Sequence, residues 1–213
     1  MIAPLFGVVF AWPYRLGLKG LHRAGFRPWQ LTLLSLVANA AIGWLILTGR
    51  LFLPGLLLMV AGLLDIFDGG LARLRGEESR WGAFMDSVID RASDIILFGC
   101  IFWVQFGQGH RVTAAFAMAA LLVSLLVSYV RAQAEALGLS LTEGFVQRLE
   151  RYVALMIGLT LPRALLWILV LLTALGGLTV IQRLWSAWRQ LPTTPGPLRR
   201  STTRRRVARR PVA

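Results

Sequence analysis

The sequence has little of what stabilises small secreted domains, and it has almost no lysine. Its 213 residues include one cysteine, Cys100, so no disulfide framework can form within the chain. The two histidines, His22 and His110, are far apart, which argues against a histidine metal site. The first residues do not form a cleavable signal pattern, because Trp12 and Pro13 interrupt their apolar run. We therefore expect the N-terminal segment to be retained.

Hydrophobic residues are abundant instead. They make up 56% of the chain, and the mean hydropathy is +0.65, which predicts an integral membrane protein. The net charge of +13 comes from 22 arginines and one lysine against ten acidic residues. The arginines flank hydrophobic runs and are not interleaved with aromatics on a soluble surface. Anionic membrane lipids and phosphorylated substrates are therefore the predicted partners, and nucleic acid is not.

Six apolar windows approach the roughly 20 residues that a membrane-spanning helix needs. We expect an all-α integral membrane protein with six transmembrane helices, and no internal repeat is visible. The fifth window is the shortest and opens with two arginines. The predicted spans are 31–47, 52–73, 82–106, 113–136, 148–161 and 165–188.

The remaining segments and the charge distribution suggest a topology. Residues 1–27 are predicted to form a juxtamembrane amphipathic helix, which Pro13 can open. Residues 28–190 form the six-helix membrane domain, and residues 191–213 an arginine-rich disordered tail. Lysine and arginine concentrate in the segments that are inside when the N-terminus is cytoplasmic. We therefore expect a multi-pass protein of the cell membrane with both termini in the cytoplasm.

All five aspartates fall between positions 65 and 94, in the most apolar part of the sequence. A carboxylate is costly in a bilayer, so such a group indicates a functional site. Asp65 and Asp68 are three residues apart and share one face of the second predicted span. Asp86, Asp90 and Asp94 recur every four residues and form a line along the third. Both sets lie near the cytoplasmic ends of these two helices, which we expect to be neighbours.

Four of these carboxylates, Asp65, Asp68, Asp86 and Asp90, cannot all stay ionised at close range without a cation. Hard oxygen ligands suit Mg²⁺ or Mn²⁺, and two such ions would clamp a phosphoryl group during in-line displacement. The active site is therefore predicted to face the cytoplasm and to perform phosphoryl transfer. The alternative is an ion-coupled transporter, which would usually spread its carboxylates over several helices near the midplane.

The spacing of these residues resembles the signature of the CDP-alcohol phosphotransferases. The motif reads Asp65, two residues, Asp68-Gly69, two residues, Ala72-Arg73, eight residues, Gly82, three residues, Asp86, three residues, Asp90. The resemblance implies a six-helix membrane enzyme, usually a homodimer. Such an enzyme transfers the phosphatidyl group of a CDP-linked lipid such as CDP-diacylglycerol to an alcohol and releases CMP.

The same resemblance implies roles for individual residues. Two divalent cations, Mg²⁺ or Mn²⁺, would be held by Asp65, Asp68, Asp86 and Asp90. Asp90 would also be the catalytic base that takes the proton of the attacking hydroxyl. Asp94 has no matching position, and metal ordering, contact with the acceptor and a supporting role all stay open. The CDP-lipid site would be lined by Gly69, Ala72, Arg73 and Gly82.

Arginines at the predicted cytoplasmic level suggest an acceptor that already carries a phosphate, because guanidinium groups match phosphate oxygens. Within the family, several stretches of the chain resemble the phosphatidylinositol phosphate synthases, whose acceptor is inositol phosphate. Glycerol phosphate is the alternative acceptor, since it would need similar arginines. Snorkelling to lipid headgroups is the other interpretation of each one. The candidate acceptor-phosphate residues are Arg131, Arg148, Arg151 and Arg183.

Overall fold

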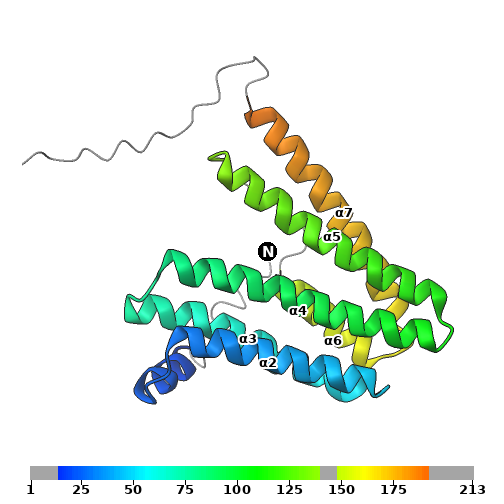
Figure 1. Ribbon diagram of the computed structural model, residues 1–213, viewed down its shortest axis with the longest axis horizontal. Coiled ribbons are helices and arrows are strands. Elements are labelled where there is room, and N and C mark those ends of the chain that lie inside the picture. The colour runs from blue at the N-terminus through cyan, green and yellow to red at the C-terminus, as the bar shows by residue number, and fades with distance from the viewer. Residues whose placement is uncertain (1–13, 140–147, 192–213) are drawn as a thin grey trace, which may run out of the picture.

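The computed structural model describes residues 14–139 and 148–191, and within these ranges it contains helices and no strands (Figure 1). Residues 14–23 are helical and precede the six long helices. The predictions for residues 1–13, the arginine-rich tail and the loop 140–147 lie outside the described residues. The long helices are α2 (Pro28–Leu47), α3 (Phe52–Arg75), α4 (Arg80–Gly107), α5 (Arg111–Ala136), α6 (Arg148–Thr160) and α7 (Leu165–Gln190).

These bounds agree with the six predicted windows to within three residues at each end, so the all-α prediction is confirmed. Four helices, α2, α3, α5 and α7, are long and apolar enough to cross a membrane. In contrast, α4 has 28 residues but carries charged side chains in its first half. With 13 residues, α6 is about 20 Å long, shorter than a hydrocarbon core. The count of six spans therefore stays a prediction.

Each long helix packs against two others, and together they close a ring in the order α2, α4, α5, α7, α6, α3. Although α3 and α4 are consecutive, no Cα of one lies within 8 Å of a Cα of the other in the described chain. Both pack against α2 instead. The sequence predicted direct neighbours, and the structure separates them because α2 provides the packing surface for both.

The two ends of the ring differ in chemistry. Buried apolar side chains from all six helices fill the end where α2, α4 and α6 finish, with Ile46, Leu58, Phe98 and Leu169 among the fully buried ones. The aspartates lie toward the other end. There α5 and α7 tilt away from α2, α3 and α4 along their C-terminal halves (Figure 1). Packing therefore anchors one end and leaves the opposite end to polar side chains.

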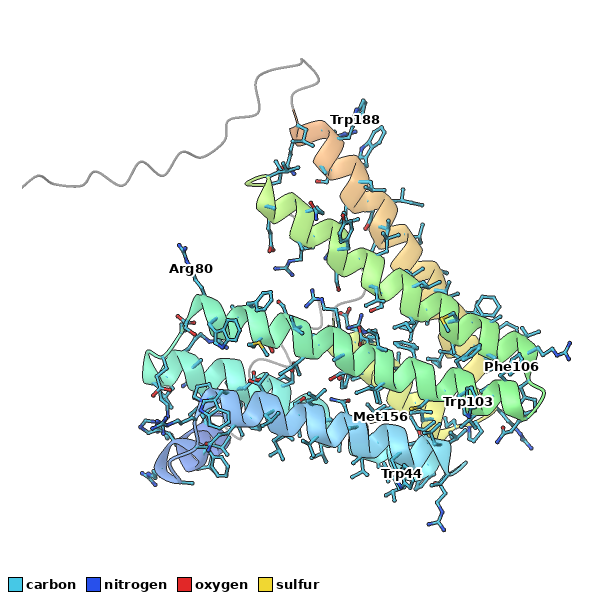
Figure 2. The ribbon with its side chains drawn as sticks, in the orientation of Figure 1. Trp44, Arg80, Trp103, Phe106, Met156 and Trp188 are labelled. Carbon is cyan, nitrogen blue, oxygen red and sulfur yellow. The ribbon has the colours of Figure 1, made fainter. Side chains whose placement is uncertain are left out.

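Exposed tryptophans lie at both ends of the bundle, where amphipathic rings are suited to the two membrane–water interfaces. Trp44 and Trp103 are each about 70% exposed at the apolar-core end, whereas Trp188 lies near the end of α7, at the opposite end of the bundle (Figure 2). Large exposed apolar side chains cover the helices between these ends. Such a surface is that of a protein whose helices contact lipid.

The helix of residues 14–23 docks on the aspartate end of α3. Its Leu18 is buried against Leu31 and Leu71, and the Tyr14 ring stacks on Phe67 with centroids 5.5 Å apart. A Cβ added at Gly70 would collide with the Tyr14 hydroxyl. The absence of a side chain at position 70 therefore allows this helix to approach α3.

Replacing Gly70 by alanine is expected to lower the free energy of unfolding by about 1 to 3 kcal/mol, because it overpacks this contact. The measurement is the unfolding midpoint of the purified protein in detergent. Gly99→Ala on α4, where an added Cβ meets nothing within 4 Å, is the matched control and should not lower the midpoint. Tyr14→Phe should recover part of the loss in the Gly70→Ala background. Equal midpoints for the two glycine variants would contradict the docking.

Candidate active site

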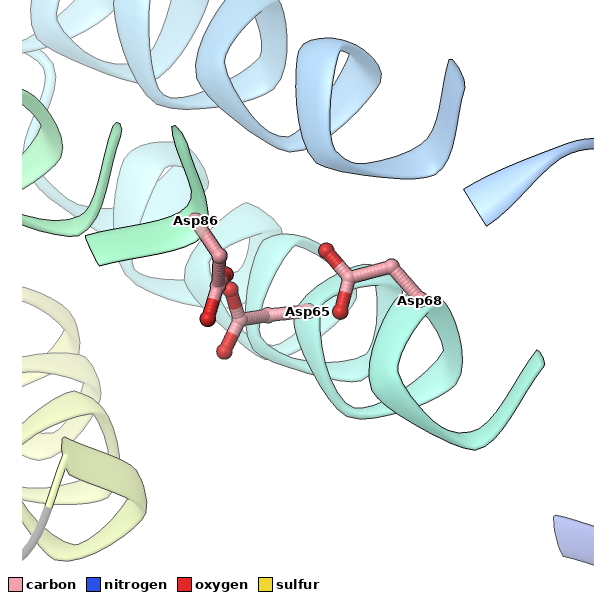
Figure 3. A group of neighbouring side chains, drawn as sticks. All are labelled: Asp65, Asp68 and Asp86. Carbon is pink, nitrogen blue, oxygen red and sulfur yellow. The ribbon is translucent and has the colours of Figure 1, made fainter. Parts of the chain in front are cut away.

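Three aspartates converge from α3 and α4. Asp65 and Asp68 are on one face of α3, and Asp86 projects from α4 toward them (Figure 3). One carboxylate oxygen from each lies within 4.8 Å of the others. This spacing is suitable for carboxylates that share a bound cation. The predicted convergence of these three residues is therefore present in the structure.

The turn between α3 and α4 sets the register of this group. Gly76 ends α3 in the left-handed region with φ of 63°, which a residue with a side chain rarely adopts. Ser79 then caps α4, because its side-chain oxygen accepts the Gly82 amide hydrogen at 2.9 Å. Asp86 follows Gly82 by about one helical turn. Gly82, which the sequence places at the CDP site, thus also lies at the start of α4.

The site is electrostatically incomplete without a cation. Asp68 is 6% exposed, and its Oδ2 is buried with no hydrogen-bond partner among the described residues. Asp65 and Asp86 are half-buried beside it. Three carboxylates this close repel one another unless positive charge lies between them. An oxygen-only set of this kind fits Mg²⁺ or Mn²⁺.

Residues predicted for the CDP-lipid site surround the α3 part of this group. Gly69 follows Asp68 directly, and the Arg73 guanidinium approaches to 3.9 Å of the position that a Cβ on Gly69 would take. Ala72 is half-buried on the next turn, and Arg73 is exposed. Small residues and one exposed cation thus lie beside the carboxylates, where a phosphate could approach the backbone.

Asp90 lies one helical turn beyond Asp86 on α4, about 6 Å along the axis, and is half-buried. It is not one of the three aspartates whose oxygens approach within 4.8 Å. Its predicted roles as a fourth ligand and as the base stay predictions.

Asp94, whose role the sequence left open, has two partners in the interior. Its Oδ2 accepts a hydrogen bond of 2.8 Å from the Ser124 hydroxyl on α5 and lies 3.0 Å from Nη2 of Arg151 on α6. Nη1 of Arg151 donates to the same hydroxyl oxygen. Sequence reasoning missed Ser124, because a single serine in an apolar helix gives no signal that distinguishes it from a solvating or packing residue.

The other candidate acceptor arginines occupy different environments. Arg183 is buried on α7, and its Nη1 donates to the Val127 carbonyl oxygen on α5 at 2.8 Å. Arg131 is exposed and pairs with Glu135 at 2.8 Å. Arg131 and Glu135 lie close enough to Arg183 for their charges to interact with it. Arg131 and Arg183 therefore belong to one region of the α5–α7 pair. The Arg148 side chain lies outside the described residues.

Thr32 also lies near the carboxylate group. It lies on α2 beside Asp68, with which its side chain interacts, and α2 is the helix that contacts both α3 and α4. Thr32 therefore links α2 to the carboxylate group.

Comparisons with known proteins decide the family. A model of the CDP-alcohol phosphatidyltransferase family matches residues 26–189, most of the chain. The chain belongs to the CDP-alcohol phosphatidyltransferase family. It is therefore a transferase and a multi-pass membrane protein.

Relatives within this family are similar over most of the chain. The phosphatidylinositol phosphate synthase of Mycobacterium marinum is 34% identical over 189 residues, covering 84% of this chain and 79% of that protein. The archaetidylinositol phosphate synthase of Methanothermobacter thermautotrophicus is 34% identical over 149 residues, covering 68% of this chain and 74% of that protein.

Two crystal structures of the Mycobacterium tuberculosis phosphatidylinositol phosphate synthase have the same fold. The one with CDP-DAG bound superposes with a TM-score of 0.75 at 32% identity, covering 86% of this chain and 95% of that one. The one in complex with manganese and citrate gives a TM-score of 0.74 at 33% identity, covering 84% and 88%. The three-carboxylate group of this phosphatidyltransferase thus agrees with the use of divalent cations in its family.

Asp68→Asn is expected to weaken Mn²⁺ binding about tenfold or more, because it removes a charged ligand from a buried oxygen set. Free and bound Mn²⁺ can be measured by electron paramagnetic resonance of the purified protein in detergent. Glu78→Gln removes an exposed carboxylate from the nearby α3–α4 turn and is the matched control, which should bind Mn²⁺ as the wild type does. Equal losses in the two variants would contradict the assignment of Asp68.

Proposed function

We propose that this phosphatidyltransferase transfers the phosphatidyl group of CDP-diacylglycerol to a hydroxyl of inositol phosphate and releases CMP. The observation that carries this proposal is the approach of Asp65, Asp68 and Asp86 to within 4.8 Å on a fold shared with a CDP-DAG-bound phosphatidylinositol phosphate synthase. The chain's similarity to several inositol phosphate synthases supports the choice of acceptor.

In this proposal Asp65, Asp68, Asp86 and Asp90 hold two divalent cations, Mg²⁺ or Mn²⁺. When bound, the cations supply charge neutralisation for the pyrophosphate and for the departing CMP. The chain's own groups bind and orient the donor. Arg73 lies on the α3 face next to Gly69 and can pair with a phosphate oxygen, while the small residues Gly69, Ala72 and Gly82 leave room for the CDP group.

Asp90 takes the proton. The acceptor hydroxyl oxygen forms a bond to the phosphorus next to the diacylglycerol, and the pyrophosphate P–O bond to CMP breaks. The hydroxyl proton passes to the Asp90 carboxylate, and CMP leaves with the bonding electron pair. The position of Asp90, one turn along α4 from Asp86, supports this role. The base has to lie beside the donor phosphate, within hydrogen-bond reach of the attacking hydroxyl.

The acceptor's own phosphate is bound by arginines in this proposal, with Arg131, Arg148, Arg151 and Arg183 as the candidates. Arg131 and Arg183 lie in one region of α5 and α7, at the end of the ring that carries the aspartates. Arg151 reaches Asp94, which follows Asp90 by one turn. Cations on both sides of this end favour a doubly charged acceptor over serine or free inositol.

We further propose six membrane spans, with α4 and α6 crossing as well as the four apolar helices. The 28 residues of α4 correspond to about 42 Å, more than a bilayer core. Residues 1–27 would lie at the cytoplasmic interface, 28–190 would be the catalytic domain, and 191–213 would attract anionic lipid. Both termini and the active site would face the cytoplasm, and the protein would act as a homodimer.

An acceptor screen tests the proposed reaction. Purified protein with CDP-diacylglycerol and Mg²⁺ is expected to release CMP rapidly with inositol phosphate and at least tenfold more slowly with free inositol or serine. Faster release with glycerol phosphate would replace the acceptor and keep the reaction class. Uptake or voltage-driven flux in proteoliposomes, without CMP release, would overturn the enzyme proposal in favour of transport.

Asp90→Asn is expected to reduce the rate of CMP release about 100-fold or more, since an amide cannot accept the hydroxyl proton. Binding of CDP-diacylglycerol, measured by titration of the same variant, should stay detectable because the α3 side of the site is intact. Glu135→Gln, at an exposed carboxylate on α5, provides a control for general charge effects. Retention of full turnover by Asp90→Asn would refute the base assignment.

A further inference from the structure

Arg151 extends from α6 across the interior of the ring. The α6 helix packs against α3 and α7, yet the Arg151 guanidinium contacts Asp94 on α4 and Ser124 on α5. Asp94 is 3% exposed and Ser124 6%, so the contact is buried. Three helices that are not all neighbours are thus joined by one ion pair and two hydrogen bonds.

The hydrogen bonds of this group are consistent in direction. Ser124 has one hydroxyl proton and donates it to Oδ2 of Asp94, so its oxygen is free to accept from Nη1 of Arg151. Nη2 of Arg151 lies 3.0 Å from the same Oδ2. Asp94 and Ser124 therefore hold both terminal nitrogens of the guanidinium, which fixes its plane as well as its position.

One edge of the guanidinium remains available. Nε of Arg151 is buried, and among the described residues it has no hydrogen-bond acceptor. A buried N–H without an acceptor is costly, so this edge is suited to an oxygen ligand. Nε and the second hydrogen of Nη2 point in parallel from a planar fork, which matches two oxygens of a phosphate.

The position along α4 relates this edge to the reaction. Asp86, Asp90 and Asp94 follow one another at intervals of four residues, about 6 Å each along the helix. Asp86 belongs to the carboxylate group, Asp90 is the proposed base, and Asp94 holds Arg151. An acceptor with its hydroxyl at Asp90 would have its far side within one helical turn of the Arg151 guanidinium.

We propose that Asp94 is a positioning residue: with Ser124 it orients the Arg151 guanidinium so that the Nε edge binds the acceptor's phosphate. This inference rests on the proposed function, since it takes its ligand from the transfer to a phosphorylated alcohol. It gives the fifth aspartate a role distinct from metal binding. A buried ion pair adds little stability compared with apolar packing, so we attribute this one to the orientation of a functional cation.

The test uses steady-state kinetics of the full-length protein with both substrates varied. Asp94→Asn keeps the shape of the side chain but removes its charge, and we expect the KM for inositol phosphate to rise tenfold or more. The KM for CDP-diacylglycerol and the Mn²⁺ affinity should stay within twofold of the wild type. Ser124→Ala is a milder change that keeps the test possible if Asp94→Asn does not fold. It should also raise the KM for inositol phosphate without raising that for CDP-diacylglycerol.

A double-mutant cycle provides a second readout. If Asp94 acts through Arg151, Asp94→Asn should have no further effect on the acceptor KM in an Arg151→Ala background, whereas independent effects would multiply. Gln105→Leu removes a buried polar group near the opposite end of α4, where it contacts His110, and is the matched control for polar loss on this helix. It should change neither KM.

The outcomes separate this inference from the proposed function. If the wild type releases no CMP with any phosphorylated alcohol, the proposed function fails, and the assignment of Asp94 fails with it. If the wild type is active but Asp94→Asn raises both KM values equally, or weakens Mn²⁺ binding, only the positioning role is overturned. It is also overturned if the effects of Asp94→Asn and Arg151→Ala on the acceptor KM multiply in the double variant. A rise in the acceptor KM alone, with no further rise in the double variant, supports it.

Discussion

Mutual repulsion among Asp65, Asp68 and Asp86 is the constraint on which the rest of the structure depends. Their oxygens approach to within 4.8 Å, a spacing at which ionised carboxylates repel one another. Such an arrangement is stable only if the backbone holds the carboxylates in place and a cation offsets their charge. The backbone support comes from α2, which packs against α3 and α4 and keeps them from packing on each other. The three carboxylates thus lie between two helices that do not pack directly on each other.

The division of the ring into two ends follows from this constraint. Polar and charged groups at one end contribute little packing, so the helices depend on the apolar core at the opposite end. Two further sets of contacts join helices at the polar end. The helix of residues 14–23 packs on α3 through Tyr14 and Phe67, and the buried group of Asp94, Ser124 and Arg151 joins α4, α5 and α6. Tilting of α5 and α7 at this end separates their C-terminal halves from α2, α3 and α4 (Figure 1).

Much of the fold and part of the site could be predicted from the sequence. Helix bounds follow from apolar windows, and the spacing of Asp65, Asp68 and Asp86 fixes which faces they share. The separation of α3 from α4 could not be predicted, because a short connection usually indicates packed neighbours. The Ser124 contacts could not be predicted either, because they join positions 27 and 30 residues apart through side chains of different helices. Local periodicity carries no information on such contacts.

The order of the helices in the ring has a consequence for biosynthesis. All the aspartates are on α3 and α4, but the ring closes only when α7 inserts between α5 and α6, and α7 is synthesised after the other five described helices. Until then α6, which carries Arg151, has α3 as its sole packing partner among the described helices. A nascent or truncated chain would therefore contain the charged half of the site without the enclosure that orients a second substrate. Closure of the ring around the site is thus coupled by topology to the synthesis of α7.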